Sequence, residues 1–190
     1  MHGKCILVPE LANRWDSMAL RLAKRLDWLD GRPSWLFVCV LYLARWVLLA
    51  PYLVAAEYLF SNAEASGAQM SKLSEISPIV LFAMIVILSP LVETLLECSL
   101  PYFVLSFLRR KRGKLPARPW LFVMISALVM ASMHPVLSAV VPSLVTGAFL
   151  AYCYGHFAVR GTGRAIVFTT IFHAGINIVG WTMIAVGVTG

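Results

Sequence analysis

Five long runs of apolar residues, separated by polar connections, make up most of the sequence. The runs cover residues 35–60, 78–108, 120 to about 137, 141–157 and 165 to about 188. An α-helix of about 20 apolar residues crosses the hydrocarbon core of a bilayer. The third run is the shortest, and Pro135, directly after His134, predicts a helix break or kink at its end. The pattern predicts an all-α fold, a polytopic transmembrane helix bundle of about five spans.

The segment before the first run has a different pattern, in which apolar residues recur at intervals of three and four. They are Leu11, Trp15, Met18, Leu22, Leu26 and Leu29, with Arg14, Arg21, Lys24 and Arg25 among the intervening residues. This periodicity predicts an amphipathic helix that either lies on anionic lipid headgroups or packs on the cytoplasmic ends of the spans. We therefore expect an interfacial segment, residues 1–33, followed by a transmembrane bundle, residues 34–190.

Composition and charge support the membrane assignment and orient the chain. Apolar residues make up 60% of the 190 residues and charged residues only 13%, which is too little polar surface for a soluble globule. Basic residues gather before the first run and in the connections 109–118 and 158–164, whereas connection 61–77 has only Lys72. The positive-inside rule predicts a cytoplasmic N-terminus. We expect a multi-pass protein of the plasma (inner) membrane. These connections explain the net charge of +7, so no nucleic-acid partner is expected.

Polar side chains inside the apolar runs are the candidate functional residues. Glu93, His134, His173 and Asn177 lie on three separate runs. An ionisable group in the hydrocarbon region costs a few kcal/mol, so it usually faces a protein interior or a wet cavity and has a function. A carboxylate, two imidazoles and a carboxamide are suited to activating water and stabilising an oxyanion.

Each of these positions also has a structural interpretation. Glu93 and Glu97 are one helical turn apart and should project from one face, so at least one should be protonated or paired with a cation. Arg45 in the first run could pair with Glu57 or Glu97 in a purely structural salt bridge. His134 alone could be a core histidine with its hydrogen bonds satisfied. His173 and Asn177, at i and i+4, can point into one small volume.

Three strings that contain these residues resemble the signatures of a known family. They are PLVETLLEC at residues 90–98, SALVMASMH at 126–134 and HAGIN at 173–177. The strings are similar to the three signatures of the CPBP intramembrane proteases, which include the CaaX prenyl endopeptidases and the bacteriocin-processing Abi proteins. The resemblance covers about residues 80–180, and its third string is the most specific part.

The chain departs from the family pattern around the conserved chemistry. The family usually has a second glutamate directly after the first and an arginine five positions after it, where this chain has Thr94 and Cys98. Met130 stands where the second signature usually has a phenylalanine, and the family's polar position four residues after the histidine falls on Ser138. The glutamate, two histidines and asparagine that the family is thought to use for chemistry are all present.

The resemblance implies an intramembrane endopeptidase of the glutamic type. In this mechanism Glu93, hydrogen-bonded with His134, activates a water, and His173 and Asn177 bind the oxyanion. We expect three supporting residues: Glu97, Arg45 and Thr94. The expected partners are a peptide or protein substrate at the membrane and the lipid bilayer itself, and neither a metal nor another cofactor is expected.

Two other functions are compatible with the same residues. A glutamate and two histidines could hold a metal ion in a membrane hydrolase, although the chain lacks a HExxH helix and asparagine is a poor zinc ligand. The polar residues could instead pair structurally in a non-catalytic membrane scaffold or a transporter subunit.

Overall fold

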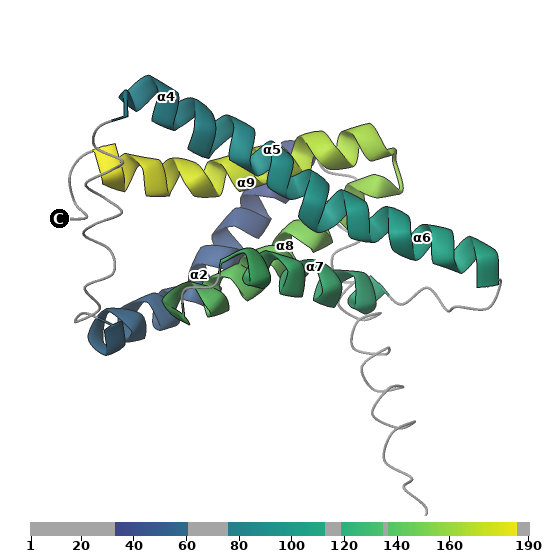
Figure 1. The fold of residues 1–190 in the computed structure, drawn as a ribbon, viewed down its shortest axis with the longest axis horizontal. Helices are drawn as coiled ribbons and strands as arrows, with labels where there is room; N and C mark the ends of the chain where they lie inside the picture. Colours follow the sequence, from purple (N-terminus) through teal and green to yellow (C-terminus); the bar gives the residue numbers. More distant parts are fainter. Residues whose placement is uncertain (1–32, 61–75, 113–118, 135–136, 186–190) are drawn as a thin grey trace, which may run out of the picture. The chain divides into compact units, whose positions relative to one another are not determined.

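The computed structural model describes residues 33–60, 76–112, 119–134 and 137–185, and within these ranges the chain is helical and contains no strand. The chain divides into two compact units, residues 1–39 and residues 40–190. The first long helix is α2 (Ser34–Phe60), and the last three are α7 (Pro119–Met133), α8 (Leu137–Ala158) and α9 (Thr162–Ala185) (Figure 1). The all-α prediction is confirmed. The amphipathic helix predicted around residues 11–29 lies outside the described residues.

A continuous helical run between α2 and α7 is assembled from five consecutive pieces. They are α4 (Pro78–Phe82), η3 (Ala83–Leu88), α5 (Ser89–Glu93), η4 (Thr94–Ser99) and α6 (Leu100–Arg112), where η denotes a π-helix. Each π-helix ends two residues before a proline, Pro90 or Pro101. In the first, the N–H of Ser89 donates to the carbonyl of Met84, five residues earlier. The carbonyl of Ile85 then has no donor at the corresponding position, because Pro90 has no N–H.

Four helical segments of the described part of the chain are long and apolar enough to cross a membrane, which makes the chain a multi-pass membrane protein. The spans are Ser34–Ala55, Pro78–Leu108, Ala139–Ala158 and Thr162–Thr182. The apolar part of α7, Trp120–Met133, is shorter than the length a bilayer requires. The helix ends where the sequence predicted a break, since the N–H of His134 turns back to the carbonyl of Ala131 at 3.2 Å. Four of the five predicted spans therefore have full length, and the third is short.

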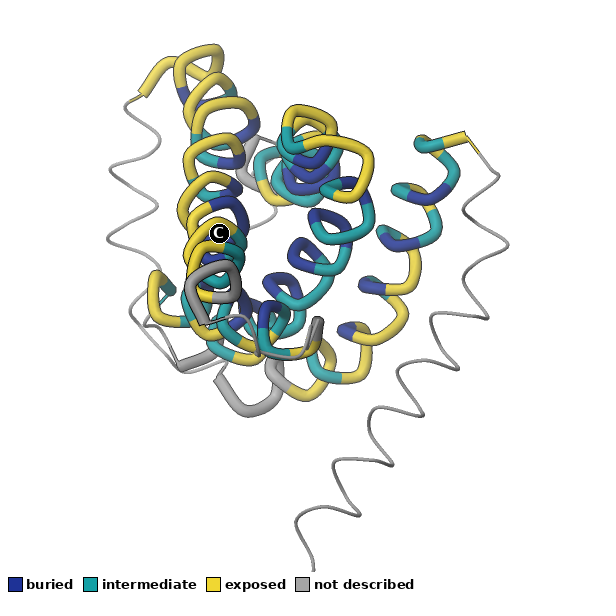
Figure 2. Tube along the Cα trace, turned by 90° about the vertical axis from the view of Figure 1, so that its right-hand side faces the viewer, coloured by how far each residue is buried: buried dark blue, intermediate teal, exposed yellow. Residues whose placement is uncertain are grey.

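Burial follows the pattern expected of helices that face lipid on one side. Large apolar side chains such as Leu43, Ile79, Ile87 and Phe103 are exposed. The exposed residues lie along the outer sides of the helices and the buried residues face neighbouring helices (Figure 2). In water such an apolar surface would aggregate, so the lipid bilayer is its natural partner.

The core of residues 40–190 is built around α8, which packs against both α7 and α9. Leu150, Tyr154 and Phe157 of α8 are fully buried. Gly147 allows the close approach of α7, because a Cβ at this position would lie 2.8 Å from the Cα of Ala127. The η3 and α5 segments pack against α9. This packing brings α5, the end of α7, α8 and α9 around a common space.

Candidate functional site

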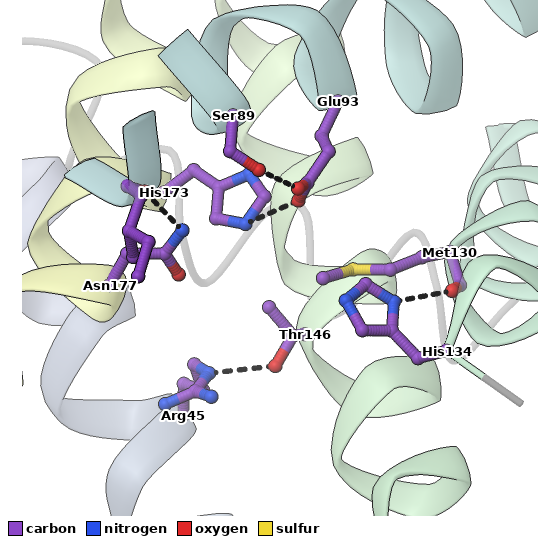
Figure 3. Close-up of polar contacts among 9 residues, drawn as sticks. Arg45, Ser89, Glu93, Met130, His134, Thr146, His173 and Asn177 are labelled. Carbon is purple, nitrogen blue, oxygen red and sulfur yellow. Dashed lines mark hydrogen bonds and ion pairs between the residues drawn. The ribbon is translucent and has the colours of Figure 1, made fainter. Parts of the chain in front are cut away.

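A cavity of about 450 Å³ lies between these helices. Its polar lining comes from α2, α5, the end of α7, α8 and α9. The polar side chains are those of Arg45, Ser89, Glu93, His134, Ser143, Thr146, His173 and Asn177, and all of them except Ser143 are labelled in Figure 3. All four candidate residues from the sequence therefore line one cavity. Its remaining walls are largely apolar, with Ile85, Pro142 and Val179 among them.

Two neighbouring side chains, those of Ser89 and His173, hold the Glu93 carboxylate at the cavity. The hydroxyl of Ser89, one turn earlier, donates to Oε1, and Nε2 of His173 lies 3.2 Å from Oε2 (Figure 3). The Glu93 side chain is 16% exposed, whereas that of His173 is 2% exposed. The carboxylate is thus fixed by α5 and α9 while part of it stays open to a small molecule such as water.

The pairing of Glu93 differs from the sequence-based expectation. We expected its hydrogen bond to involve His134, and the structure gives that place to His173. The Nδ1 atom of His173 is buried and has no hydrogen-bond partner among the described residues. A carboxylate accepts hydrogen bonds only, so the neutral His173 ring carries its proton on Nε2 in this arrangement.

His134 lies at the end of α7 on another wall of the cavity. Its Nδ1 is 3.0 Å from the carbonyl oxygen of Met130, one turn earlier. A carbonyl oxygen only accepts, so Nδ1 of the neutral ring is the donor and Nε2 is left as the basic nitrogen. This contact uses the backbone of Met130, so the replacement of the family's usual phenylalanine by methionine does not remove it.

Asn177 lies one turn after His173 on α9, as the i and i+4 spacing predicted. Its Nδ2 donates to the carbonyl oxygen of Ile85 at 2.9 Å. This is the carbonyl that the π-helix and Pro90 leave without a donor in its own helix. One amide N–H and the carbonyl oxygen of Asn177 remain for a bound molecule.

Arg45 does not pair with Glu97, which corrects one of our structural interpretations. Its Nε donates to Oγ1 of Thr146 at 2.9 Å, and its guanidinium carbon lies 4.7 Å from the ring centroid of Trp46. Both oxygens of Glu97 are buried without a hydrogen-bond partner among the described residues. The side chain of Glu57, the other partner considered for Arg45, lies outside the described residues.

The other expected supports lie apart from the cavity. Glu97 and Thr94 are fully buried, and neither lines the cavity. Of the two glutamates predicted to project from one face, only Glu93 lines the cavity, and η4 begins directly after it. The side chain of Ser138 lies outside the described residues.

Sequence reasoning missed two polar contacts of the site. Ser89 precedes Glu93 by four residues, a spacing that could have indicated the contact. Thr146 could not be found in this way, because it meets Arg45 only through the packing of α8 near α2. Within the described part of the chain, no group of three or more His, Cys, Asp or Glu side chains is arranged to hold a metal ion.

Comparisons with known proteins add nothing to the resemblance described from the sequence. No family model, no curated protein and no solved structure matches the chain.

Proposed function

We propose that the chain is an intramembrane endopeptidase similar to the CPBP proteases, which hydrolyses a peptide bond of a membrane-associated peptide or protein. The observation that carries this proposal is the meeting of Glu93, His134, His173 and Asn177 at one cavity. These side chains come from three separate segments of an apolar bundle, where polar groups are costly. A carboxylate, a basic imidazole nitrogen and an amide donor around one space suit hydrolysis by an activated water.

The reaction begins with a water between Glu93 and His134. The water oxygen attacks the scissile carbonyl carbon while one of its protons passes to the Glu93 carboxylate, and Nε2 of His134 accepts a hydrogen bond from the same water. The carbonyl oxygen becomes an oxyanion. When the carbon–nitrogen bond breaks, the proton on Glu93 passes to the leaving amine, which restores the carboxylate.

His173 and Asn177 stabilise the oxyanion. Asn177 has an N–H that its bond to Ile85 does not use. The Nε2–H of His173 is initially held by the negative charge of Glu93. Once Glu93 accepts the proton from water, this charge-assisted hydrogen bond weakens and the imidazole N–H is released toward the oxyanion. Donors for the oxyanion thus become available as its charge develops.

Hydrolysis can be tested directly with the purified protein in vesicles of phosphatidylcholine and phosphatidylglycerol. The protein is incubated with a library of membrane-anchored peptides in water enriched in heavy oxygen, and the products are analysed by mass spectrometry. We expect fragments with heavy oxygen in the newly formed carboxylate. Glu93→Gln should lower the rate by roughly 100-fold or more, since it removes the base, while its thermal unfolding stays close to that of the wild type.

A matched control uses the second glutamate of the same helix. Glu97→Gln should retain most of the activity, because Glu97 does not line the cavity. If this variant loses as much activity as Glu93→Gln, the wrong carboxylate has been assigned. If the product pattern is the same with and without Glu93, the protease proposal is wrong.

The orientation and location belong to the same proposal. The basic connections favour a cytoplasmic N-terminus in the plasma (inner) membrane. A reporter enzyme that is active only in the cytoplasm, fused to the N-terminus, should be active. An inactive reporter in a stably inserted fusion would reverse the orientation.

A non-catalytic scaffold or transporter subunit is the competing function, and one observation favours it: Ser89 and His173 already satisfy the Glu93 carboxylate. If Glu93→Gln lowers the unfolding temperature and no heavy oxygen enters any product, the scaffold is supported. A metal-dependent hydrolase makes a different prediction, since a chelator should then abolish cleavage and added zinc restore it.

A further inference from the structure

Arg45 is a buried cation at the wall of the proposed active-site cavity. The residue is 6% exposed and lines the cavity together with Trp46 and Thr146. Thr146 accepts from Nε, while Nη1 has no hydrogen-bond partner among the described residues. The guanidinium is thus positioned by protein contacts, yet part of its donor capacity is unused.

No carboxylate among the described side chains neutralises Arg45. The described acidic side chains are those of Glu93 and Glu97, since that of Glu57 lies outside the described residues. Glu93 is engaged by Ser89 and His173, and both oxygens of Glu97 lack a hydrogen-bond partner. A guanidinium remains charged in proteins, and a buried charge is costly unless an anion pairs with it. An anionic group from a bound molecule would remove this cost.

The surroundings of Arg45 favour such a ligand. Nε is fixed by Thr146, and the side chain lies over the Trp46 ring, so little side-chain freedom is left to lose when an anion binds. Figure 3 shows Arg45 and Thr146 facing the space that Glu93, His134 and His173 also border. A molecule in this cavity can therefore present one group to Glu93 and another to Arg45.

We propose that Arg45 binds a carboxylate of the substrate, which makes it a specificity-determining residue of the protease proposed above. The inference rests on that proposed function. The planar guanidinium pairs with planar carboxylates through parallel hydrogen bonds. A carboxylate carries a single negative charge, so Glu93 in the same cavity repels it less than it would a dianionic phosphate. The carboxylate belongs either to the C-terminus of the peptide or to an acidic side chain.

Matched peptides identify the source of the carboxylate. One cleaved sequence is prepared with a free C-terminus, with a C-terminal amide, and with each Asp or Glu replaced by its amide. We expect loss of the relevant carboxylate to lower kcat/KM at least tenfold, mainly by raising KM. An effect of C-terminal amidation alone identifies the C-terminus, and an effect of Asp or Glu replacement identifies a side chain. Equal cleavage of all the peptides overturns the proposal.

Arg45 variants link this selectivity to the guanidinium. Arg45→Gln should cleave the charged and neutral peptides equally well, and Arg45→Lys should keep part of the preference. Thr146→Val, which removes only the acceptor for Nε, should weaken the preference less than Arg45→Gln. The ratio between two peptides on the same protein sample is not changed by partial misfolding. If Arg45→Gln keeps the wild-type ratio, Arg45 is not the carboxylate site.

Binding separates failure of this inference from failure of the proposed function. The Kd of each peptide is measured with the Glu93→Gln protein, which should not cleave it. The carboxylate site is supported, even without cleavage, if this protein binds the charged peptide more tightly than the neutral one. The difference should disappear in the double variant that also carries Arg45→Gln. If cleavage depends on Glu93 but the Kd is the same for peptides with and without the carboxylate, only the Arg45 inference fails. Competition by phosphatidic acid, without any peptide preference, would assign the site to a lipid phosphate and also reject the proposal.

Discussion

The side chain of Asn177 donates a hydrogen bond to the backbone carbonyl of Ile85 at 2.9 Å, joining α9 to a π-helix of the neighbouring helical run. The Ile85 carbonyl is available because neither neighbouring residue donates to it. The backbone N–H of Ser89 donates to the carbonyl of Met84, and Pro90 has no N–H. An irregular helical turn thus orients the amide of the proposed oxyanion site. The proline that causes the irregularity is three residues before Glu93.

Replacing this proline should release Asn177. In Pro90→Ala the new N–H can donate to the carbonyl of Ile85, where it competes with Asn177, or to the carbonyl of Val86, as in a regular α-helix. We expect kcat to fall roughly 10-fold with little change in KM. This is less than the roughly 100- to 1000-fold loss on removing an oxyanion donor, because Asn177 is misplaced and not removed. Steady-state kinetics on one peptide substrate provide the measurement. Pro101→Ala, at the equivalent position after η4, is the control, and it should leave kcat closer to the wild-type value.

His134 variants should separate its two ring nitrogens. His134→Asn can still donate to the Met130 carbonyl but lacks the basic nitrogen that corresponds to Nε2. We expect both His134→Asn and His134→Gln to lower kcat about 100-fold or more, in line with loss of an acid–base group, with a small change in thermal unfolding. Full activity of His134→Asn would show that only the contact with Met130 matters.

Gly147 should be the least tolerant glycine of α8. In Gly147→Ala the new Cβ would meet the Cα of Ala127 at 2.8 Å and the Cβ of Met130 at 3.0 Å, so α7 has to shift. We expect a loss of about 1–3 kcal/mol in the free energy of unfolding, as for other overpacked cores. Gly163→Ala is the matched control because a Cβ there meets nothing within 4 Å. Unfolding in detergent should show a lower midpoint for the first variant only.

Glu97 should be dispensable for stability. Its two carboxyl oxygens are buried without hydrogen-bond partners among the described residues, and an unsatisfied buried polar group costs about 1–3 kcal/mol. Glu97→Met has a similar length and no polar atom, so we expect the midpoint of thermal unfolding to rise. A fall of several degrees would mean that Glu97 has a stabilising partner, such as a buried water.

Local sequence patterns were sufficient to predict much of the fold and to select four polar residues that line the cavity. The apolar runs predicted the helices because the bilayer demands long apolar segments, and the spacing of His173 and Asn177 placed both at one cavity because both lie on a regular helix. The partners of Glu93 and Arg45 could not be predicted, since they depend on how separate helices pack. For the same reason, the i and i+4 spacing of Glu93 and Glu97 could not show that only Glu93 would line the cavity.

The position of His173 along α9 sets a minimum length for any substrate of the proposed protease that enters from the end of the bundle where α9 begins. His173 lies 11 residues along α9, from 162 to 173, which corresponds to about 17 Å at the helical rise of about 1.5 Å per residue. An extended peptide advances about 3.3–3.6 Å per residue, so roughly five residues are needed to cover that distance. For the proposed protease we therefore expect that a peptide bond closer than this to a folded domain at that surface does not reach Glu93, whereas a flexible tail of about five residues does.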